Sequence, residues 1–189
     1  FDLVVVDWDS VSIPGATVAV EIVERRWHSV QKLDPQGFVT WESTVEEIPV
    51  TRFTDLPMNA QGKATVSFTP ESGGVYKAKV TARDEFGNEA QAGAYMWVSG
   101  SDYVAWRQTD DRRIELVIDQ DEYQPGDVAE ILIAAPFQGD NYALVTVERG
   151  HIRTEEVLRL ATNSAVYRLP ITADMAPNIY VSVLGIQGA

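Results

Sequence analysis

Side chains that usually carry acid–base or metal chemistry are scarce in this chain. The sequence contains two histidines, His28 and His151, and no cysteine. Neither histidine lies in an H-x-x-H or H-E-x-x-H spacing, so the sequence indicates neither a zinc site nor a Ser-His-Asp triad. The lack of cysteine excludes disulfides, thiolate ligands and cysteine nucleophiles from these residues. We therefore predict two surface histidines and a chain that is not an enzyme, with no catalytic residue, no cofactor and no bound metal.

One group of carboxylates could supply oxygen ligands to a calcium ion. Asp119, Asp121 and Glu122 lie close together in the sequence, and Asp110 and Asp111 come shortly before them. A D-x-D-x-D-G loop, which would place such ligands around one ion, is absent. Acidic residues are also common at strand ends, so we favour a charged turn here over a calcium site.

The tryptophans could form an aromatic platform for a sugar or could fill a core. They are Trp8, Trp27, Trp41, Trp97 and Trp106. A strand-borne tryptophan in a sandwich more often packs in the core or at a domain junction, because its large ring buries much apolar area. We therefore expect structural roles for them and keep sugar binding as the alternative.

The most ordered local pattern is a turn followed by a strand. The motif Y-x-P-G-D consists of Tyr123, Pro125, Gly126 and Asp127. The proline fixes φ at the first corner, and the glycine supplies the positive φ that the next position often needs. Asp127 can close the turn by accepting backbone N–H groups. Residues 129–135 then alternate as a strand, which Pro136 ends because proline has no N–H for a ladder, so we predict a structural turn motif.

Period-two strands separated by glycine and proline corners continue along the whole chain. In the first half we expect strands over residues 1–8, 18–27, 38–48, 64–69, 76–82 and 94–98, and a second long segment after residue 48, through Phe53, that crosses to the opposite sheet. That makes about seven strands at the spacing of a sandwich. No stretch shows a convincing 3.6-residue period, so the sequence predicts an all-β fold.

The strand pattern divides the chain into two tandem immunoglobulin-like β-sandwich domains. We place them over residues 1–102 and 112–189, joined by a connector over 103–111. The connector carries two aromatic residues, so we expect it to pack against a domain and hold the pair in a fixed relation. The second domain shows six strands, over residues 114–118, 129–135, 142–147, 155–160, 165–171 and 179–184. A seven-stranded sandwich needs one more, so we expect the second domain to lack its last strand and to leave an unpaired edge.

Charge and hydropathy exclude several classes of partner. The net charge is −13, with acidic residues in excess in both halves. A field of that sign repels phosphate backbones, so we expect no nucleic-acid partner. No window approaches the ~18–20 apolar residues of a membrane span, so we expect no membrane-spanning segment. The chain begins with Phe1 and shows no signal peptide, and we expect it to be a piece of a longer protein.

An ordered series of motifs resembles those of a known family. The Y-x-P-G-D turn, the apolar strand after it and Ala135-Pro136-Phe137 resemble the start of the bait-region domain of bacterial alpha-2-macroglobulins. The likeness continues in order through residues 143–150, 167–171 and 176–183. Upstream, residues 23–27, 74–76 and 97–100 are similar to the preceding macroglobulin-like domain.

The resemblance implies two macroglobulin-like sandwiches of a large extracytoplasmic protein, which would be periplasmic, on the cell surface or secreted. In that family a protease cuts an exposed bait segment, and the assembly changes shape and traps the protease. Many members also attach it through a Cys–Gln thioester, but this chain has no cysteine and shows no long unstructured insert. The implied function is a non-catalytic structural fragment of a broad-spectrum protease-trapping inhibitor that scaffolds the bait region.

The partners implied are other domains of the same longer chain and, through the full-length protein, target proteases. The alternative is an immunoglobulin-like module pair from a bacterial surface adhesin or carbohydrate-binding protein.

Overall fold

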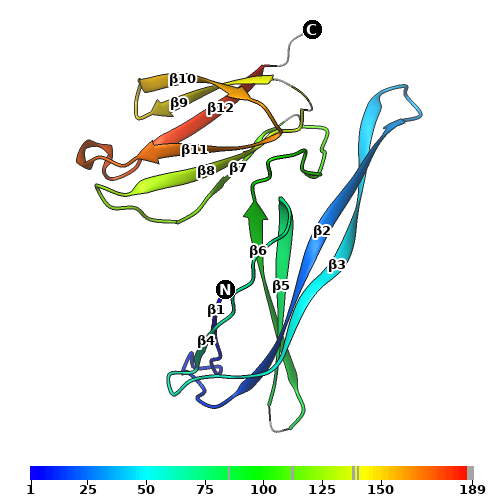
Figure 1. The fold of residues 1–189 in the computed structure, drawn as a ribbon, viewed down its shortest axis with the longest axis vertical. Coiled ribbons are helices and arrows are strands. Elements are labelled where there is room, and N and C mark those ends of the chain that lie inside the picture. The colour runs from blue at the N-terminus through cyan, green and yellow to red at the C-terminus, as the bar shows by residue number, and fades with distance from the viewer. Residues whose placement is uncertain (85, 112, 138, 140, 187–189) are drawn as a thin grey trace. The chain divides into compact units, whose positions relative to one another are not determined.

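The computed structural model describes residues 1–84, 86–111, 113–137, 139 and 141–186. Strands dominate these residues, which confirms the predicted all-β fold class (Figure 1). In chain order they are β1 (Asp2–Val4), β2 (Thr17–Leu33), β3 (Val39–Pro57), β4 (Lys63–Thr65), β5 (Gly74–Arg83), β6 (Glu89–Val98), β7 (Glu115–Ile118), β8 (Val128–Ala134), β9 (Asn141–Glu148), β10 (Ile152–Leu160), β11 (Ser164–Pro170) and β12 (Tyr180–Ile186). One short 3₁₀ helix, η1 (Ala173–Met175), precedes the last strand.

Contacts within the chain group it into two compact units. Unit 1 contains Phe1–Arg26 and Val45–Val98, and unit 2 contains Trp27–Thr44 and Ser99–Ala189. The outer part of the β2–β3 hairpin, which is the end of β2, the turn and the start of β3, is therefore grouped with the second half of the chain. The sequence-based domain boundaries at residues 102 and 111 stay predictions.

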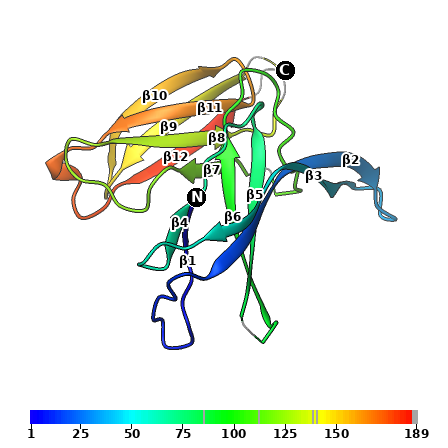
Figure 2. The same cartoon turned by 60° about the horizontal axis from the view of Figure 1, so that its bottom comes forward.

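Unit 1 is built on a four-stranded sheet with the order β3-β2-β5-β6, and on a two-stranded sheet of β1 and β4 (Figure 2). Alternate residues of a strand face the same side of a sheet, so the period-two pattern directs one set of side chains inward. Val20 and Ile22 of β2 and Tyr76 and Ala78 of β5 are buried in one core. The strands expected over residues 18–27 and 76–82 are thus confirmed.

Three strand predictions in this half are wrong. Of the strand expected over residues 64–69, only Lys63–Thr65 (β4) forms. The first strand ends at Val4, because the Asp7 carboxylate accepts the N–H groups of Asp9 and Val11, each at 2.9 Å, and turns the chain. The predicted crossing near Phe53 does not occur: β3 stays beside β2 in the four-stranded sheet as far as Pro57. β3 is therefore one continuous strand beside β2, where the sequence suggested two separate strands.

Four turns in the chain share one geometry. In each, an Asp or Asn side chain accepts the N–H groups two and four residues later, at 2.8–2.9 Å. These side chains belong to Asp7, Asp34, Asn59 and Asp84. The residue three positions later has a positive φ, and these residues are Ser10, Gly37, Gly62 and Gly87. Three of these turns are glycine corners between strands, as expected from the sequence, because each depends only on residues that are neighbours in sequence.

Unit 2 contains a sandwich of two three-stranded antiparallel sheets, β11-β8-β7 and β10-β9-β12 (Figure 1). The six strands predicted for this half are all present. Ala129 of β8, Val147 of β9 and Leu169 of β11 meet in a core between the sheets. Among the described residues, β7 pairs only with β8 and β12 only with β9, so each sheet has an unpaired edge strand.

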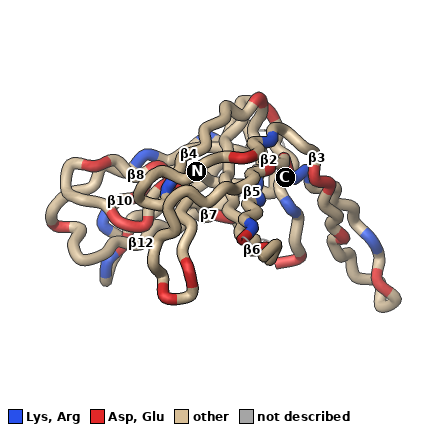
Figure 3. The backbone as a smooth tube through the Cα atoms, turned by 90° about the horizontal axis from the view of Figure 1, so that it is seen from below, with Lys and Arg blue, Asp and Glu red and all other residues tan. Residues whose placement is uncertain are grey.

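Charged side chains are spread along the chain instead of being gathered in one segment. Figure 3 shows acidic and basic positions on strands and turns of both halves. Several pair across neighbouring strands, as Arg83 does with Glu89 and Arg168 with Glu130, each pair at 2.8 Å. None of the helices formed by the described residues is long and apolar enough to cross a membrane.

Candidate functional site

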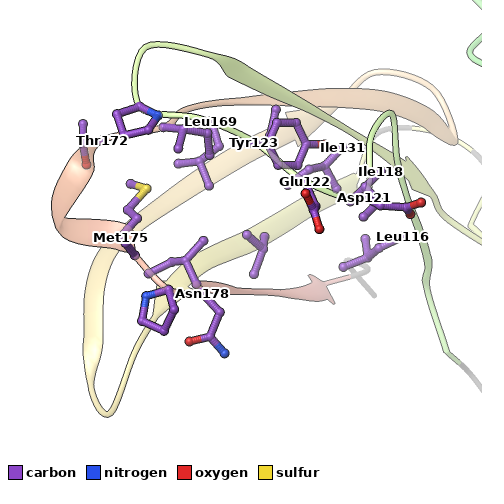
Figure 4. A pocket seen from close by; sticks show the side chains of 17 residues that line it. Leu116, Ile118, Asp121, Glu122, Tyr123, Ile131, Leu169, Thr172, Met175 and Asn178 are labelled. Carbon is purple, nitrogen blue, oxygen red and sulfur yellow. The ribbon is translucent and has the colours of Figure 1, made fainter.

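An apolar pocket of about 560 Å³ lies between the two sheets of the second sandwich (Figure 4). Leu116 of β7, Ile131 of β8 and Leu169 of β11 line one side, and Ile179 and Val181 line the side formed by β12. β7 and β12, each at one edge of its sheet, thus both border the pocket. Because concave apolar sites are where proteins usually bind other molecules, we treat this pocket as the candidate site.

The Y-x-P-G-D motif shapes one end of the pocket. The Asp127 N–H donates to the Gln124 carbonyl at 3.0 Å, and Gly126 has a φ of 104°, which glycine adopts without strain. The Asp127 carboxylate accepts the Gln124 N–H at 2.7 Å. Two backbone hydrogen bonds of 2.9 Å, from Gly126 to Ile171 and from Ile171 to Asp127, join the turn to the end of β11. The motif therefore fixes Pro125 in the pocket wall.

Asp119 holds Tyr123 in the same wall. The Tyr123 hydroxyl donates to Asp119 Oδ1 at 2.7 Å, and the Glu130 N–H donates to that oxygen at 2.8 Å. The hydrogen bond from Tyr123 is the main cause that lowers the pKa of Asp119. Burial, followed by the bond to Asp119, raises the pKa of Tyr123. Asp119 therefore acts as a structural carboxylate that joins the loop after β7 to β8.

Asp121 and Glu122 stand at the rim and have no hydrogen bond or ion pair among the described residues. Figure 4 shows them beside Ile118, on the side of the pocket away from Met175. Within the described part of the chain, no three His, Cys, Asp or Glu side chains are grouped so that they could hold a metal ion. Asp110, considered above as a calcium ligand, instead accepts a backbone N–H at 2.6 Å.

Beyond the pocket, the segment between the two halves is held by one buried side chain. Asn163, in the turn before β11, is 2% exposed. Its side chain accepts the N–H of Val104 at 2.8 Å and donates to the carbonyl of Val104 at 2.7 Å. The backbone carbonyl of Asn163 accepts the indole N–H of Trp106 at 2.9 Å. Val104 and Trp106 are both buried, so residues 103–111 lie against the second sandwich as part of unit 2.

The same segment binds the outer hairpin of unit 2. The Ser29 and Ser43 hydroxyls, one from each strand, lie 2.8 Å apart. Ser43 donates to the Gln108 carbonyl at 2.8 Å, and Ser29 accepts the Gln108 N–H at 3.3 Å. The guanidinium of Arg107 lies 5.3 Å from the centre of the Trp27 ring, within cation–π range. Both strands of the hairpin are therefore bonded to one backbone position.

The tryptophans and histidines lie in different environments. Trp106 is 5% exposed and fills the contact described above, whereas Trp8 is fully exposed, so the expected core or junction role is wrong for Trp8. The strand pattern was misleading there, because the strand ends before this residue. The histidines His28 and His151 are both exposed.

Sequence reasoning missed Asn163, Ser29 and Ser43. Small polar residues in turns and on strands usually face solvent, so their types alone gave no signal. A partial signal for Asn163 was available: Val104 and Trp106 alternate as a strand would, and a buried extended segment needs hydrogen-bond partners.

Comparison with known proteins identifies relatives for both halves. The family model of the alpha-2-macroglobulin bait region domain matches residues 114–188. An alpha-2-macroglobulin homolog from Nostoc is 24% identical over 99% of the chain, and an alpha-2-macroglobulin from Ralstonia nicotianae is 34% identical over 70% of it. The chain spans about a tenth of the length of these two relatives, 10% and 8% respectively.

Among solved structures, the native conformation of Escherichia coli alpha-2-macroglobulin aligns with 97% of this chain and 12% of its own, at 22% identity and a TM-score of 0.47. The family match over the second sandwich and the curated relatives that align with 99% and 70% of the sequence lead to one conclusion: the chain belongs to the alpha-2-macroglobulin family.

Proposed function

We propose that the chain is a non-catalytic structural part of an alpha-2-macroglobulin-like protease-trapping inhibitor, in which its sandwiches scaffold the bait region. The observation that carries the proposal is the match of residues 114–188 to the bait region domain, together with relatives named alpha-2-macroglobulin. The parent protein would act outside the cytoplasm, and its target proteases would meet it through the full-length chain.

The architecture supports a mechanical role. Backbone hydrogen bonds and a shared core make each sandwich a stiff body, and the connecting segment is bonded at Asn163 and Gln108 instead of being free. A scaffold of this kind resists local deformation, so a cut in a bait segment would be passed on as movement of whole domains.

The test uses the full-length protein with trypsin as the probe protease. Residual trypsin activity is measured on a large substrate, casein, and on a small chromogenic peptide. Trapping is expected to suppress casein cleavage at least tenfold and to leave peptide cleavage within twofold, because a cage excludes only large substrates. Equal inhibition of both substrates, or inhibition of neither, would contradict the proposal.

The proposal that the chain is not catalytic is tested on the 189-residue chain alone. Incubation with casein and with the chromogenic peptide is expected to give no turnover above buffer. Hydrolysis that persists after repeated purification would show that the chain is an enzyme.

A further inference from the structure

A polar groove of about 750 Å³ lies on the four-stranded sheet of unit 1. Residues of β2, β3, β5 and β6 line it, and all of them belong to unit 1. β2 and β5, in the middle of this sheet, are each paired with a strand on both sides. Their backbone N–H and C=O groups are therefore used within the sheet, and a ligand in the groove would be held by side chains.

Alternate residues of β5 and β6 follow one another along the groove as three cross-strand pairs. These pairs are Lys77 with Tyr95, Lys79 with Gly93, and Thr81 with Gln91. Successive pairs are two residues apart, which is about 7 Å along a strand. Gly93 does not have a positive φ, so its backbone conformation does not require glycine. What the glycine contributes is space, because the absence of a side chain leaves room for a ligand beside Lys79.

The groove has an excess of positive charge, although the net charge of the chain is −13. Lys79 Nζ lies 2.5 Å from a carboxylate oxygen of Glu47 and 3.9 Å from one of Glu21, so both carboxylates of the groove face the same lysine. The hydrogen bond from Lys79 is the main cause that lowers the pKa of Glu47, and the charge of Lys77 adds to it. Arg52 and Lys77 form no ion pair among the described residues. These two cations favour a ligand with negative charge.

The uncharged groups of the groove suit a sugar better than a peptide. The side chain of Tyr95 is 45% exposed and offers an aromatic face on which a sugar ring can pack. Within the described part of the chain, the side chains of Thr81 and Gln91 make no hydrogen bond, so they can bond the hydroxyl groups of a ligand. An extended peptide would find no strand partner for its own N–H and C=O groups, because those of β5 are already paired on both sides.

We propose that this groove binds a short oligosaccharide that carries carboxylate groups. The carboxylates pair with Arg52 and Lys77, one sugar ring packs on Tyr95, and the hydroxyl groups bond to Thr81 and Gln91. The site lies within unit 1 and is independent of whether the parent protein traps proteases.

Two fluorescently labelled acidic sugars, trigalacturonate and trimannuronate, test the site on the 189-residue chain. One control is the methyl ester of trigalacturonate, which keeps the sugar and removes the charge. A second control is the acidic peptide acetyl-Glu-Thr-Glu-Thr-Glu-amide. Fluorescence anisotropy at physiological ionic strength is expected to give at least one acidic sugar an affinity tenfold or more above that of both controls. Binding of neither sugar, an ester that binds as well as the acid, or a peptide that binds as well as the sugars overturns the proposal.

Three variants locate the binding. Arg52→Gln removes an exposed cation of the groove and is expected to weaken the acidic sugar at least fivefold. Lys63→Gln makes the same change of charge at an exposed position of β4 outside the groove, and it is expected to leave the affinity within twofold. Gly93→Val fills the middle of the groove and is expected to weaken the acidic sugar and the methyl ester alike.

Thermal unfolding checks that each variant keeps the fold. Equal losses in Arg52→Gln and Lys63→Gln would mean that net charge alone attracts the sugar, and they overturn the proposal. An unchanged affinity in Arg52→Gln overturns it as well, even if Gly93→Val fails to fold.

Discussion

At the scale of single residues, Asn163 is the side chain on which the connecting segment depends. It satisfies both backbone groups of Val104 in a buried place where water cannot replace it. A buried side-chain amide that bonds both the N–H and the C=O of one residue makes the same two hydrogen bonds as a neighbouring β-strand would. The side chain of Asn163 therefore substitutes for a strand partner that Val104 lacks.

We expect Asn163→Ala to lower the free energy of unfolding by about 2–4 kcal/mol, because two buried backbone groups lose their partners. Urea denaturation followed by tryptophan fluorescence measures the change. Asn178→Ala is the matched control: Asn178 is exposed and, within the described part of the chain, its side chain bonds only the Tyr180 hydroxyl, so its change is expected to stay within about 0.5 kcal/mol. Equal losses in the two variants would show that the double bond to Val104 does not stabilise the fold.

At the scale of elements, the turns that share one hydrogen-bonding geometry have different surroundings. A Cβ on Gly62 would lie 3.0 Å from Ser12 Cβ and 3.1 Å from the Ile13 nitrogen, while a Cβ on Gly37 would meet nothing within 4 Å. Both glycines have a positive φ. The turn between β3 and β4 is therefore packed against the chain near Ile13, and the turn at the tip of the long hairpin is open.

This difference predicts unequal costs for one substitution. Gly37→Ala is expected to cost about 1–2 kcal/mol, which is the strain of a positive φ alone. Gly62→Ala adds a backbone clash and is expected to cost about 2 kcal/mol more. Thermal unfolding of the two variants measures both. A Gly62→Ala variant as stable as Gly37→Ala would mean that the β3–β4 turn moves away without cost.

At the scale of the whole molecule, carboxylates with lowered pKa values occur in both units. They are Glu47, Asp84, Asp111, Asp119 and Asp174. Hydrogen bonds to the charged forms are the largest cause in each, from Lys79 for Glu47 and from Tyr123 for Asp119. A lowered pKa in the folded state means that the unfolded chain takes up protons first as the pH falls. The stability that these groups contribute is therefore present above the ordinary carboxyl pKa of about 4 and is lost below it.

We expect the melting temperature to fall as the pH is lowered from about 5 to about 2. Asp119→Asn is expected to make this fall shallower, because it removes one of the hydrogen-bonded carboxylates. Asp121→Asn, which removes an equal charge without such hydrogen bonds, is the control. Melting curves at fixed ionic strength measure the slopes, and identical slopes for the two variants would contradict the role given to Asp119.

The errors of the sequence-based description have different physical origins. The strand expected over residues 1–8 ended early because the carboxylate of Asp7 offered the backbone other hydrogen bonds, and alternation alone does not register that competition. The crossing expected near Phe53 failed because alternation says which face a residue occupies, not which strand lies beside it. The rim carboxylates Asp121 and Glu122 were identified, but the pocket that they border could not be, since it needs two sheets.

By itself, the sequence determined what depends on neighbours along the chain. Period-two alternation specified most of the strands, and glycine and proline specified the corners between them, because both act over a few residues. Tertiary structure alone decided that the hairpin segment Trp27–Thr44 belongs to unit 2, that Asn163 is buried against Val104, and that apolar walls of β8 and β12 face each other across a pocket. These features join residues far apart in sequence, and their free energy exists only once the intervening chain has folded.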